Sequence, residues 1–251
     1  MDVADWVREG RHWVLTEDDT WVAFGRLHDL GSGEGWLSGA RVRSDRRGSG
    51  IGTRLLAHQL DDARSIGLNA LRAVVEDENL PSRRLFDRFG FRTAAELTLR
   101  RGSARADPAY RLTPVAPDRA RGDPIGWLPA MVDRVDLLPG SDGGRFGRWR
   151  PELLDRWARE GKLYSNGNAL VAVQVDWWTD PRTMWVNPLR GDPPSLLRAV
   201  ASLAQSLHHA EWQGFFPLSE PFLTACAADD SLLPPRWGER VRLYELVPER
   251  S

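Results

Sequence analysis

The 251-residue sequence has one cysteine, no long hydrophobic run and no excess of charge of one sign. Because Cys226 stands alone, no disulfide can form within the chain, and a reducing compartment is expected. No stretch approaches the ~20 apolar residues that a membrane helix needs, and the start lacks the basic and apolar regions of a secretory leader. We therefore expect a cytoplasmic protein without a membrane partner.

Charge is balanced, since 34 basic and 35 acidic side chains leave a formal net charge of −1. Lys162 is the only lysine, so almost all positive charge is carried by arginine. This balance gives no general electrostatic case for binding nucleic acid, although it leaves room for a local basic patch. We expect no nucleic-acid partner and no metal cofactor.

In the first hundred residues, runs of strand-forming residues alternate with stretches whose apolar residues recur at helical spacing. Asn79 is placed to cap the second helix. Gly67 is placed to end the first helix, and Gly90 is placed to end the second. The predicted elements are, in order, a hairpin of strands at 13–15 and 20–27, a loop at 28–35, a strand at 35–43, a helix after residue 50, a strand at 68–76, a helix at 79–90 and a strand at 91–100. This order indicates an α/β fold.

The second half repeats this plan. Trp157 and Gly161 of the segment DRWAREGK stand 151 residues after Trp6 and Gly10 of the similar segment DWVREGR, and the same order of elements follows each copy. The predicted elements of the second half are a strand at 110–115, helices near 125–135 and at 151–159, a hairpin at 166–167, a strand at 183–189, a helix at 195–209, a strand at 211–216, a helix near 222–228 and a strand at 240–246.

Residues 101–109 are small, charged and poor in apolar residues, which is typical of a linker. We therefore predict two tandem modules, 1–104 and 105–251. The first module has only about one turn of helix before its hairpin, so either the native start lies upstream of Met1 or its sheet lacks an edge strand. We expect the second module or another chain, as in a homodimer, to cover that edge.

Between the third predicted strand and the first helix, Gly48, Gly50 and Gly52 alternate with other residues in the stretch RRGSGIGTRLL. Each extra glycine costs roughly 1 kcal/mol relative to alanine, so the run favours close approach of a ligand over a simple surface turn. The free N–H groups of a helix start bind anions. No lysine is near, which excludes a P-loop, and Thr53 stands where a dinucleotide fingerprint has its third glycine.

The second module differs at the corresponding place, where the sequence reads Arg190-Gly191-Asp192-Pro193-Pro194. Proline has no backbone N–H, and the carboxylate of Asp192 would repel an anion. We predict that this module has no phosphate-binding loop and acts as a structural or substrate-shaping partner.

Two motifs together resemble those of the acetyl-CoA-dependent N-acetyltransferase family known as GNAT. The residues that match its pyrophosphate motif, Q/R-x-x-G-x-G/A, are Arg47, Gly50 and Gly52. The residues that match its later helix, N-x-x-A-x-x-L-Y/F-x-x-x-G-F, are Asn79, Ser82, Leu85, Phe86, Gly90 and Phe91. The resemblance covers residues 6–100 well and the second half as an eroded copy. It implies two GNAT-like domains, the second degenerate, each with a mixed, mostly antiparallel twisted sheet flanked by helices.

The resemblance also implies acetyl-CoA as cosubstrate. Its pyrophosphate would lie on the main-chain amides of Gly48, Ser49, Gly50, Ile51, Gly52 and Thr53, with Arg46, Arg47 or Arg54 at the rim. Its pantetheine arm would pair like an extra strand with Ala40, Arg41 and Val42. The implied site also includes Ser82, Phe86 and Asn79, although helix capping alone would explain Asn79.

In the family a neutral amine attacks the thioester, and an N–H of a splayed strand stabilises the tetrahedral oxyanion. Many members protonate the leaving thiolate with a tyrosine seven residues after the asparagine, but this chain has Phe86 there, which cannot donate a proton. Val74 stands where some relatives carry a glutamate base. Glu76 is therefore our candidate catalytic base, with His28 and Glu34 as rivals.

The sequence thus predicts an N-acetyltransferase that moves an acetyl group from acetyl-CoA to a primary amine of a small molecule or peptide. Two alternatives remain open. One is a CoA-binding protein without catalysis, suggested by Phe86 and the absent glutamate. The other is an interaction protein whose glycines form only a turn.

Overall fold

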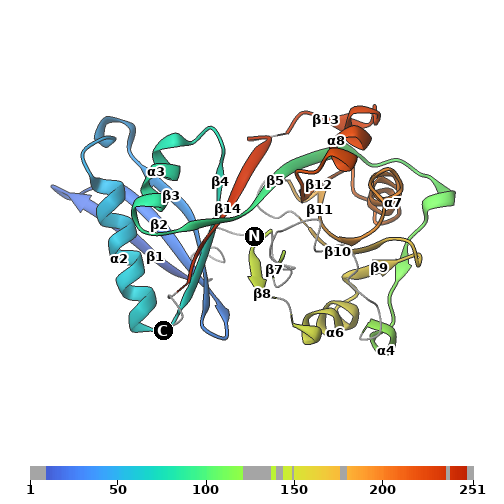
Figure 1. The fold of residues 1–251 in the computed structure, drawn as a ribbon, viewed down its shortest axis with the longest axis horizontal. Helices are drawn as coiled ribbons and strands as arrows, with labels where there is room; N and C mark the ends of the chain where they lie inside the picture. Colours follow the sequence, from blue (N-terminus) through green and yellow to red (C-terminus); the bar gives the residue numbers. More distant parts are fainter. Residues whose placement is uncertain are drawn as a thin grey trace. The chain divides into compact units, whose positions relative to one another are not determined.

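The computed structural model describes residues 10–120, 137–139, 144–148, 150–175, 180–235 and 238–247. The chain forms two compact units: unit 1 is Met1–Thr93 with Leu243–Ser251, and unit 2 is Ala94–Arg242. Each unit holds a mixed sheet with helices beside it (Figure 1), which confirms the predicted fold class. The helix predicted near 125–135 lies outside the described residues.

Unit 1 is built around an open sheet with the strand order β1-β2-β3-β4-β14. Pairing is antiparallel from β1 to β3 and parallel between β3 and β4. Its elements are β1 (Arg11–Glu17), β2 (Thr20–Gly31), β3 (Glu34–Val42), the 3-10 helix η1 (Ser44–Arg46), α2 (Ile51–Ser65), β4 (Ala70–Glu76), α3 (Leu80–Arg88) and the part of β14 (Arg240–Leu246) that starts at Leu243. The last predicted strand of the second half thus contributes its final residues to unit 1.

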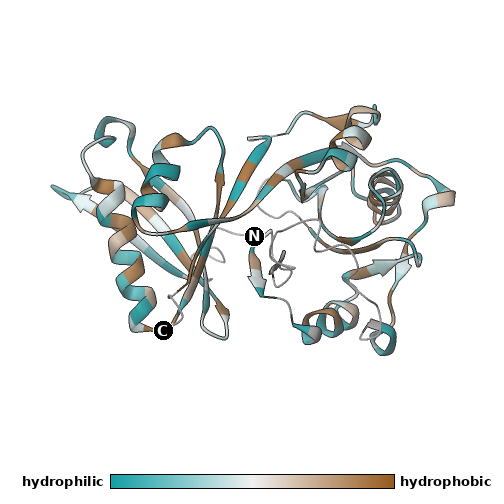
Figure 2. Ribbon diagram, in the orientation of Figure 1, coloured by the Kyte–Doolittle hydropathy of each residue, from teal (hydrophilic) through white to brown (hydrophobic). Residues whose placement is uncertain are grey.

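Helix α2 covers one face of this sheet, which we call the helix face. Apolar and polar residues alternate along α2 (Figure 2), and its apolar side is buried. Three residues of α2 pack against every second residue of β4; the two sets are Leu56, Leu60 and Ala63, and Leu71, Ala73 and Val75. Because side chains alternate across a strand, the opposite face of β4 carries Arg72, Val74 and Glu76.

The loop predicted over 28–35 is instead a tight turn between two long strands. β2 extends to Gly31 and β3 starts at Glu34, so only Ser32 and Gly33, both with positive φ, connect them. The prediction was wrong because pairing with β3 draws the polar end of β2 into the sheet, although its composition favours a loop.

Within unit 2, the strand order is β5-β12-β11-β10-β9-β6. Strands β11 and β12 are parallel, and the other neighbours are antiparallel. The elements are β5 (Arg92–Ser103, in this unit from Ala94), η2 (Pro108–Tyr110), β6 (Thr113–Pro114), α4 (Pro117–Ala120), β7 (Leu137–Pro139), β8 (Phe146–Arg148), α6 (Pro151–Arg159), β9 (Leu163–Ser165), β10 (Leu170–Val175), β11 (Thr183–Arg190), α7 (Pro193–Ser206), β12 (Glu211–Pro217), α8 (Glu220–Ala227) and β13 (Leu232–Leu233).

The linker predicted over 101–109 is partly strand, because β5 continues to Ser103 and pairs with β12. Gly102 is opposite Trp212, and a Cβ at this glycine would lie 2.6 Å from the indole ring. The glycine that indicated a linker therefore serves a close approach between strand and side chain.

Candidate functional site

Strands β3 and β4 are paired only where they begin. Three residue pairs join them, and the last is Trp36 with Arg72. β3 continues to Val42 and β4 to Glu76, so the two strands separate beyond that pair. In the part of the chain that the structure describes, β3 beyond Trp36 pairs with β2 alone. The sheet of unit 1 therefore opens between β3 and β4.

A β-bulge lies in β3 beside this opening. Ser38 pairs with Arg26 and Arg41 with Phe24, so two residues of β3, Gly39 and Ala40, stand opposite one residue of β2. Gly39 has φ +65. A bulge leaves a residue outside the ladder and re-aims its main chain. Such an N–H group can donate to an oxyanion held in the opening.

The glycine-rich loop leads from β3 into α2. Gly48 and Gly50 have φ values of +80 and +82, and a Cβ at either position would meet no atom within 4 Å. Gly50 is the N-cap residue of α2 and provides no side-chain cap. Among the described residues, the N–H groups from Gly48 to Thr53 find no acceptor. The loop thus presents unpaired donors at the positive end of a helix dipole, an arrangement that binds anions.

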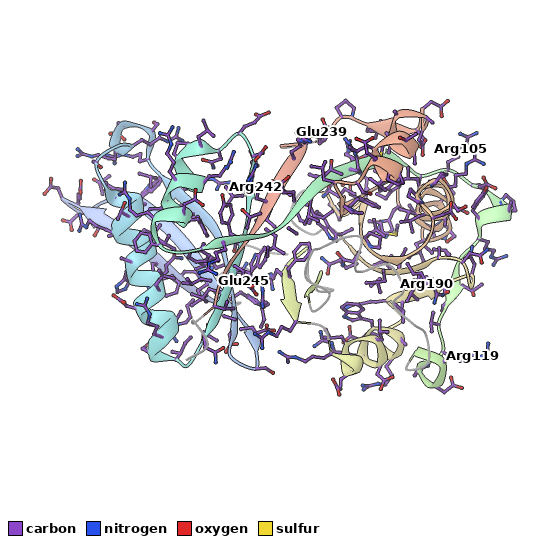
Figure 3. The ribbon with its side chains drawn as sticks, in the orientation of Figure 1. Arg105, Arg119, Arg190, Glu239, Arg242 and Glu245 are labelled. Atoms are coloured by element: carbon purple, nitrogen blue, oxygen red, sulfur yellow. The ribbon has the colours of Figure 1, made fainter. Side chains whose placement is uncertain are left out.

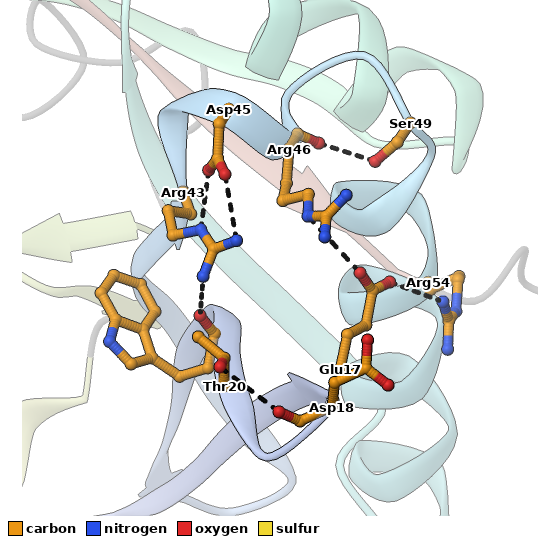
Figure 4. Close-up of polar contacts among 9 residues, drawn as sticks. Glu17, Asp18, Thr20, Arg43, Asp45, Arg46, Ser49 and Arg54 are labelled. Carbon is orange, nitrogen blue, oxygen red and sulfur yellow. Dashed lines mark hydrogen bonds and ion pairs between the residues drawn. The ribbon is translucent and has the colours of Figure 1, made fainter.

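Arginines surround this loop, and two of them face an acidic partner (Figure 4). Glu17 of β1 lies 3.6 Å from Arg46 and 4.0 Å from Arg54. The hydroxyl of Ser49 donates to the main-chain oxygen of Arg46 at 2.6 Å, which fixes the turn. For Arg47 no ion pair is found in the described part of the chain. Of the three predicted rim arginines, Arg47 is therefore the best placed to meet an anionic ligand.

A further ion pair shapes the start of the loop. The Nε and Nη2 atoms of Arg43 donate to the carboxylate of Asp45 at 2.7 and 3.0 Å. These hydrogen bonds lower the pKa of Asp45 and raise that of Arg43. Because the two opposite charges largely cancel, the pair stabilises the turn and adds little to the electrostatic field at the loop.

The corresponding helix start in unit 2 has its donors removed or occupied. Asp192 is the N-cap residue of α7, and its carboxylate accepts a hydrogen bond from the Ser195 N–H at 3.1 Å. Pro193 and Pro194 supply no N–H groups in the first turn. The start of α7 therefore offers fewer free N–H donors than the start of α2.

The strands of unit 2 also stay close where those of unit 1 separate. β11 and β12 share three parallel pairs, as β3 and β4 do. Beyond them, a Cβ at Gly214 of β12 would lie 2.2 Å from the main-chain oxygen of Val186. The rings of Trp185 and Phe215 lie 5.3 Å apart at the same level. Backbone and aromatic rings thus fill the place that is open in unit 1.

Two predicted cofactor residues bond to each other at the start of α3. The side-chain oxygen of Asn79 accepts a hydrogen bond from the Ser82 N–H at 3.2 Å, so Asn79 caps the helix as predicted. Phe86, further along α3, packs its ring 4.7 Å from Phe91 and 5.4 Å from Tyr244. Phe86 is half-buried against the core and offers no proton.

Of the three candidate bases, two are engaged in contacts with arginines. Glu34 is buried, and Nη1 of Arg72 donates to it at 3.0 Å. Nδ1 of His28 lies 3.2 Å from Nη2 of Arg26. Glu76 is half-buried at the open end of β4, and no ion pair of its carboxylate is found among the described residues. Glu76 therefore keeps its place as the candidate base.

Sequence analysis missed the buried ion cluster next to the opening. The Nε atom of Arg72 also donates to Glu245 of β14 at 2.9 Å, and all three side chains of the cluster are at most 5% exposed. Glu245 is labelled in Figure 3. The available signal was a single arginine inside the apolar strand pattern ALRAVVE, but its partners are 38 and 173 residues away.

Two further findings concern the described residues only. No helix there is long and apolar enough to cross a membrane. No group of three or more histidine, cysteine, aspartate or glutamate side chains in those ranges could hold a metal ion.

Comparisons with known proteins agree with this geometry. The model of the Acetyltransferase (GNAT) family matches residues 2–91, the segment that contains the opening and the glycine-rich loop. No curated protein matches the sequence significantly.

Solved structures share the fold over almost the whole chain. A GCN5-related N-acetyltransferase from Sphaerobacter thermophilus is 12% identical with a TM-score of 0.63, over 97% of this chain and 84% of its own. A protein from Thermoplasma acidophilum that is proposed to be an acetyltransferase is 17% identical with a TM-score of 0.63, over 94% and 78%. Over residues 2–91, the chain is similar to the Acetyltransferase (GNAT) family.

Proposed function

We propose that this protein is an N-acetyltransferase that uses acetyl-CoA and acetylates a primary amine on a small molecule or peptide. One observation carries the proposal: the unpaired main-chain donors of Gly48 to Thr53 stand at the start of α2, directly after the strand that borders the opening. The family whose model matches residues 2–91 supports acetyl transfer as the reaction.

The cosubstrate is expected to lie along β3 and across the helix start. Its pyrophosphate would accept hydrogen bonds from the amides of the loop, with Arg47 adding positive charge. Its pantetheine arm would pair with the main chain of Ala40, Arg41 and Val42, which lie at the exposed end of β3 beside the opening. The side chains of Ser82 and Phe86 on α3 would border the arm, together with Asn79.

The chemistry follows from the opening. An N–H of the Gly39–Ala40 bulge would donate to the oxyanion as the amine attacks the acetyl carbon. Glu76, on the face of β4 opposite the helices, would accept the proton that the amine must lose, directly or through water. Unit 2, with its filled gap and capped helix, would bind no acetyl-CoA of its own.

A second function is favoured by one observation. Phe86 is packed against the core and cannot protonate a thiolate, so a CoA-binding protein that does not transfer the acetyl group remains an alternative. Release of free thiol from acetyl-CoA in the presence of an amine panel distinguishes the two, because only the transferase produces thiol together with the acetylated amine.

The placement of the cosubstrate is tested by titrating acetyl-CoA into two matched variants in a calorimeter. Gly50→Asp puts a carboxylate where the pyrophosphate would lie, and we expect affinity to fall at least a hundredfold, about 2.7 kcal/mol. Gly67→Asp is the control, since Gly67 has φ +80, open surroundings and a place just beyond the other end of the same helix. The two variants should lose similar stability, and only the first should lose binding. Equal affinity in both would refute the proposed site.

A further inference from the structure

Helix α3 supplies no proton donor at Phe86, yet a phenol packs against that ring. Tyr244 of β14 lies with its ring centre 5.4 Å from that of Phe86, and the planes are inclined by 45°. Both rings belong to the apolar cluster on the helix face of unit 1. Among the described residues of this cluster, Tyr244 is the only one with a hydroxyl group.

Tyr244 is placed at the level where the sheet opens. β14 is the neighbour of β4 in the sheet, and Glu245 of β14 binds Arg72, the last residue of β4 that pairs with β3. Because side chains alternate along a strand, Tyr244 projects to the helix face while Glu245 projects to the other. The last strand of the chain thus brings a phenol close to the point where β3 and β4 separate.

The hydroxyl of Tyr244 is poised to find a partner. Only 1% of the residue is exposed, and no hydrogen bond of the hydroxyl is found in the described part of the chain. Buried tyrosines usually form a hydrogen bond through the hydroxyl. A tyrosine hydroxyl with no such bond in the described part of the chain is therefore suited to bond a ligand atom.

We propose that Tyr244 supplies the proton for the departing thiolate, in place of the phenol that α3 lacks. This inference rests on the proposed function. The amine lone pair forms the C–N bond, the C–S bond breaks with its electron pair going to sulfur, and the Tyr244 O–H gives its proton to that sulfur. The products are the acetamide and CoA thiol, and the phenolate regains a proton from solvent. Because thiols and phenols have pKa values of about 8.5 and about 10, this transfer is uphill by roughly 1.5 pKa units, and the return of a proton from solvent to the phenolate completes it.

The two faces of β4 then divide the proton transfers. Glu76 lies on the face opposite the helices and would take the proton of the amine. Tyr244 acts on the helix face, beside the α3 ring that borders the pantetheine arm. A thioester held in the opening would meet a base on one side of the sheet and an acid on the other, so neither group would neutralise the other.

The experiment compares the affinities of CoA and desulfo-CoA, which lacks only the sulfur atom, by calorimetry. In the wild type, a hydrogen bond between the phenol and the thiol should make CoA bind about two- to tenfold more tightly. Tyr244→Phe should make the two affinities equal, and adding Phe86→Tyr, which restores a phenol beside the same site, should recover the preference. Tyr164→Phe, in β9 of unit 2, is the matched control and should keep the preference.

The outcomes separate the two proposals. If both ligands bind and Tyr244→Phe keeps the wild-type preference, Tyr244 does not touch the sulfur and this inference is wrong, while the proposed function stands. If neither ligand binds the wild type, the proposed function is overturned and the role of Tyr244 with it. Thermal unfolding of each variant verifies that the hydroxyl was removed from a folded protein.

Discussion

At the scale of single residues, glycines with the same backbone angle serve different ends. Gly50 and Gly67 both have positive φ and open surroundings, but one begins α2 and the other follows its end. A helix start presents N–H donors and a helix end presents carbonyl acceptors, so only Gly50 lies in a place that attracts an anion. Position in the element gives the glycine its chemical role.

A pH effect is expected from His12 on β1. Burial lowers the pKa of His12, the charge of Arg26 lowers it further, and a hydrogen bond with the Gly10 backbone opposes both. The unfolded chain, with a histidine pKa of about 6.5, then binds the proton more readily than the folded protein. The contribution of His12 to the free energy of unfolding is therefore fully present above a pH of about 6.5. It is lost as the pH falls from there through the lower pKa of the folded state.

His12→Gln should reduce this loss, because glutamine does not titrate. Urea midpoints at pH 7.5 and pH 5 give the measurement: the wild type should lose more between the two values than the variant. Thr20→Gln is the control, since Thr20 is exposed on β2 and does not titrate, so its replacement should leave the pH dependence unchanged. Equal losses in wild type and H12Q would contradict the assignment.

At the scale of elements, one buried arginine joins three strands. Arg72 of β4 donates to Glu34 of β3 and to Glu245 of β14, and its side chain is fully buried. β3 and β4 share only three residue pairs, so this cluster holds them together just before they separate. Its polar contacts fix where the opening begins.

Arg72→Met should destabilise the protein by about 3–5 kcal/mol, because it removes the buried arginine that both carboxylates contact. Urea unfolding measures the loss. Arg64→Met removes an exposed ion pair with Asp61 and should cost less than about 1 kcal/mol. Changing Glu34 and Glu245 to glutamine in the R72M background should recover part of the loss; no recovery would mean that the buried charges are not its cause.

At the scale of the whole molecule, the two units differ in the features that we propose to bind a cosubstrate. Unit 1 has a glycine-rich helix start and an opening between parallel strands. In unit 2, Asp192 and two prolines occupy the helix start, and Gly214 lets β12 approach β11 closely. The proposed cosubstrate site is therefore confined to unit 1.

One molecule of acetyl-CoA per chain is the expected stoichiometry in calorimetry, with no second, weaker site. At a ligand concentration of 100 times the Kd, a single site should stabilise the folded protein by about 2.7 kcal/mol. In the Gly50→Asp variant, a hundredfold weaker affinity should reduce this stabilisation to about 0.4 kcal/mol at the same ligand concentration. Two molecules per chain, or binding of wild-type affinity in that variant, would place a site in unit 2.

Much of the site could be predicted because its signals are local. Glycine at positive φ, proline in a first helical turn, and an asparagine cap depend on a few neighbouring residues, so Gly50, Pro193 and Asn79 were placed correctly on their elements. The loop over 28–35 failed because strand pairing, which depends on a distant segment, overrode local composition.

By itself, the sequence determined the order of helices and strands and the helix start that can bind an anion, because these follow from backbone preferences over a few residues. Only the tertiary structure decided that the final strand lies beside β4, that Arg72 meets Glu34 and Glu245, and that Tyr244 packs on Phe86. These contacts join segments more than 30 residues apart, and the packing of the whole core selects among many partners that the sequence alone would allow.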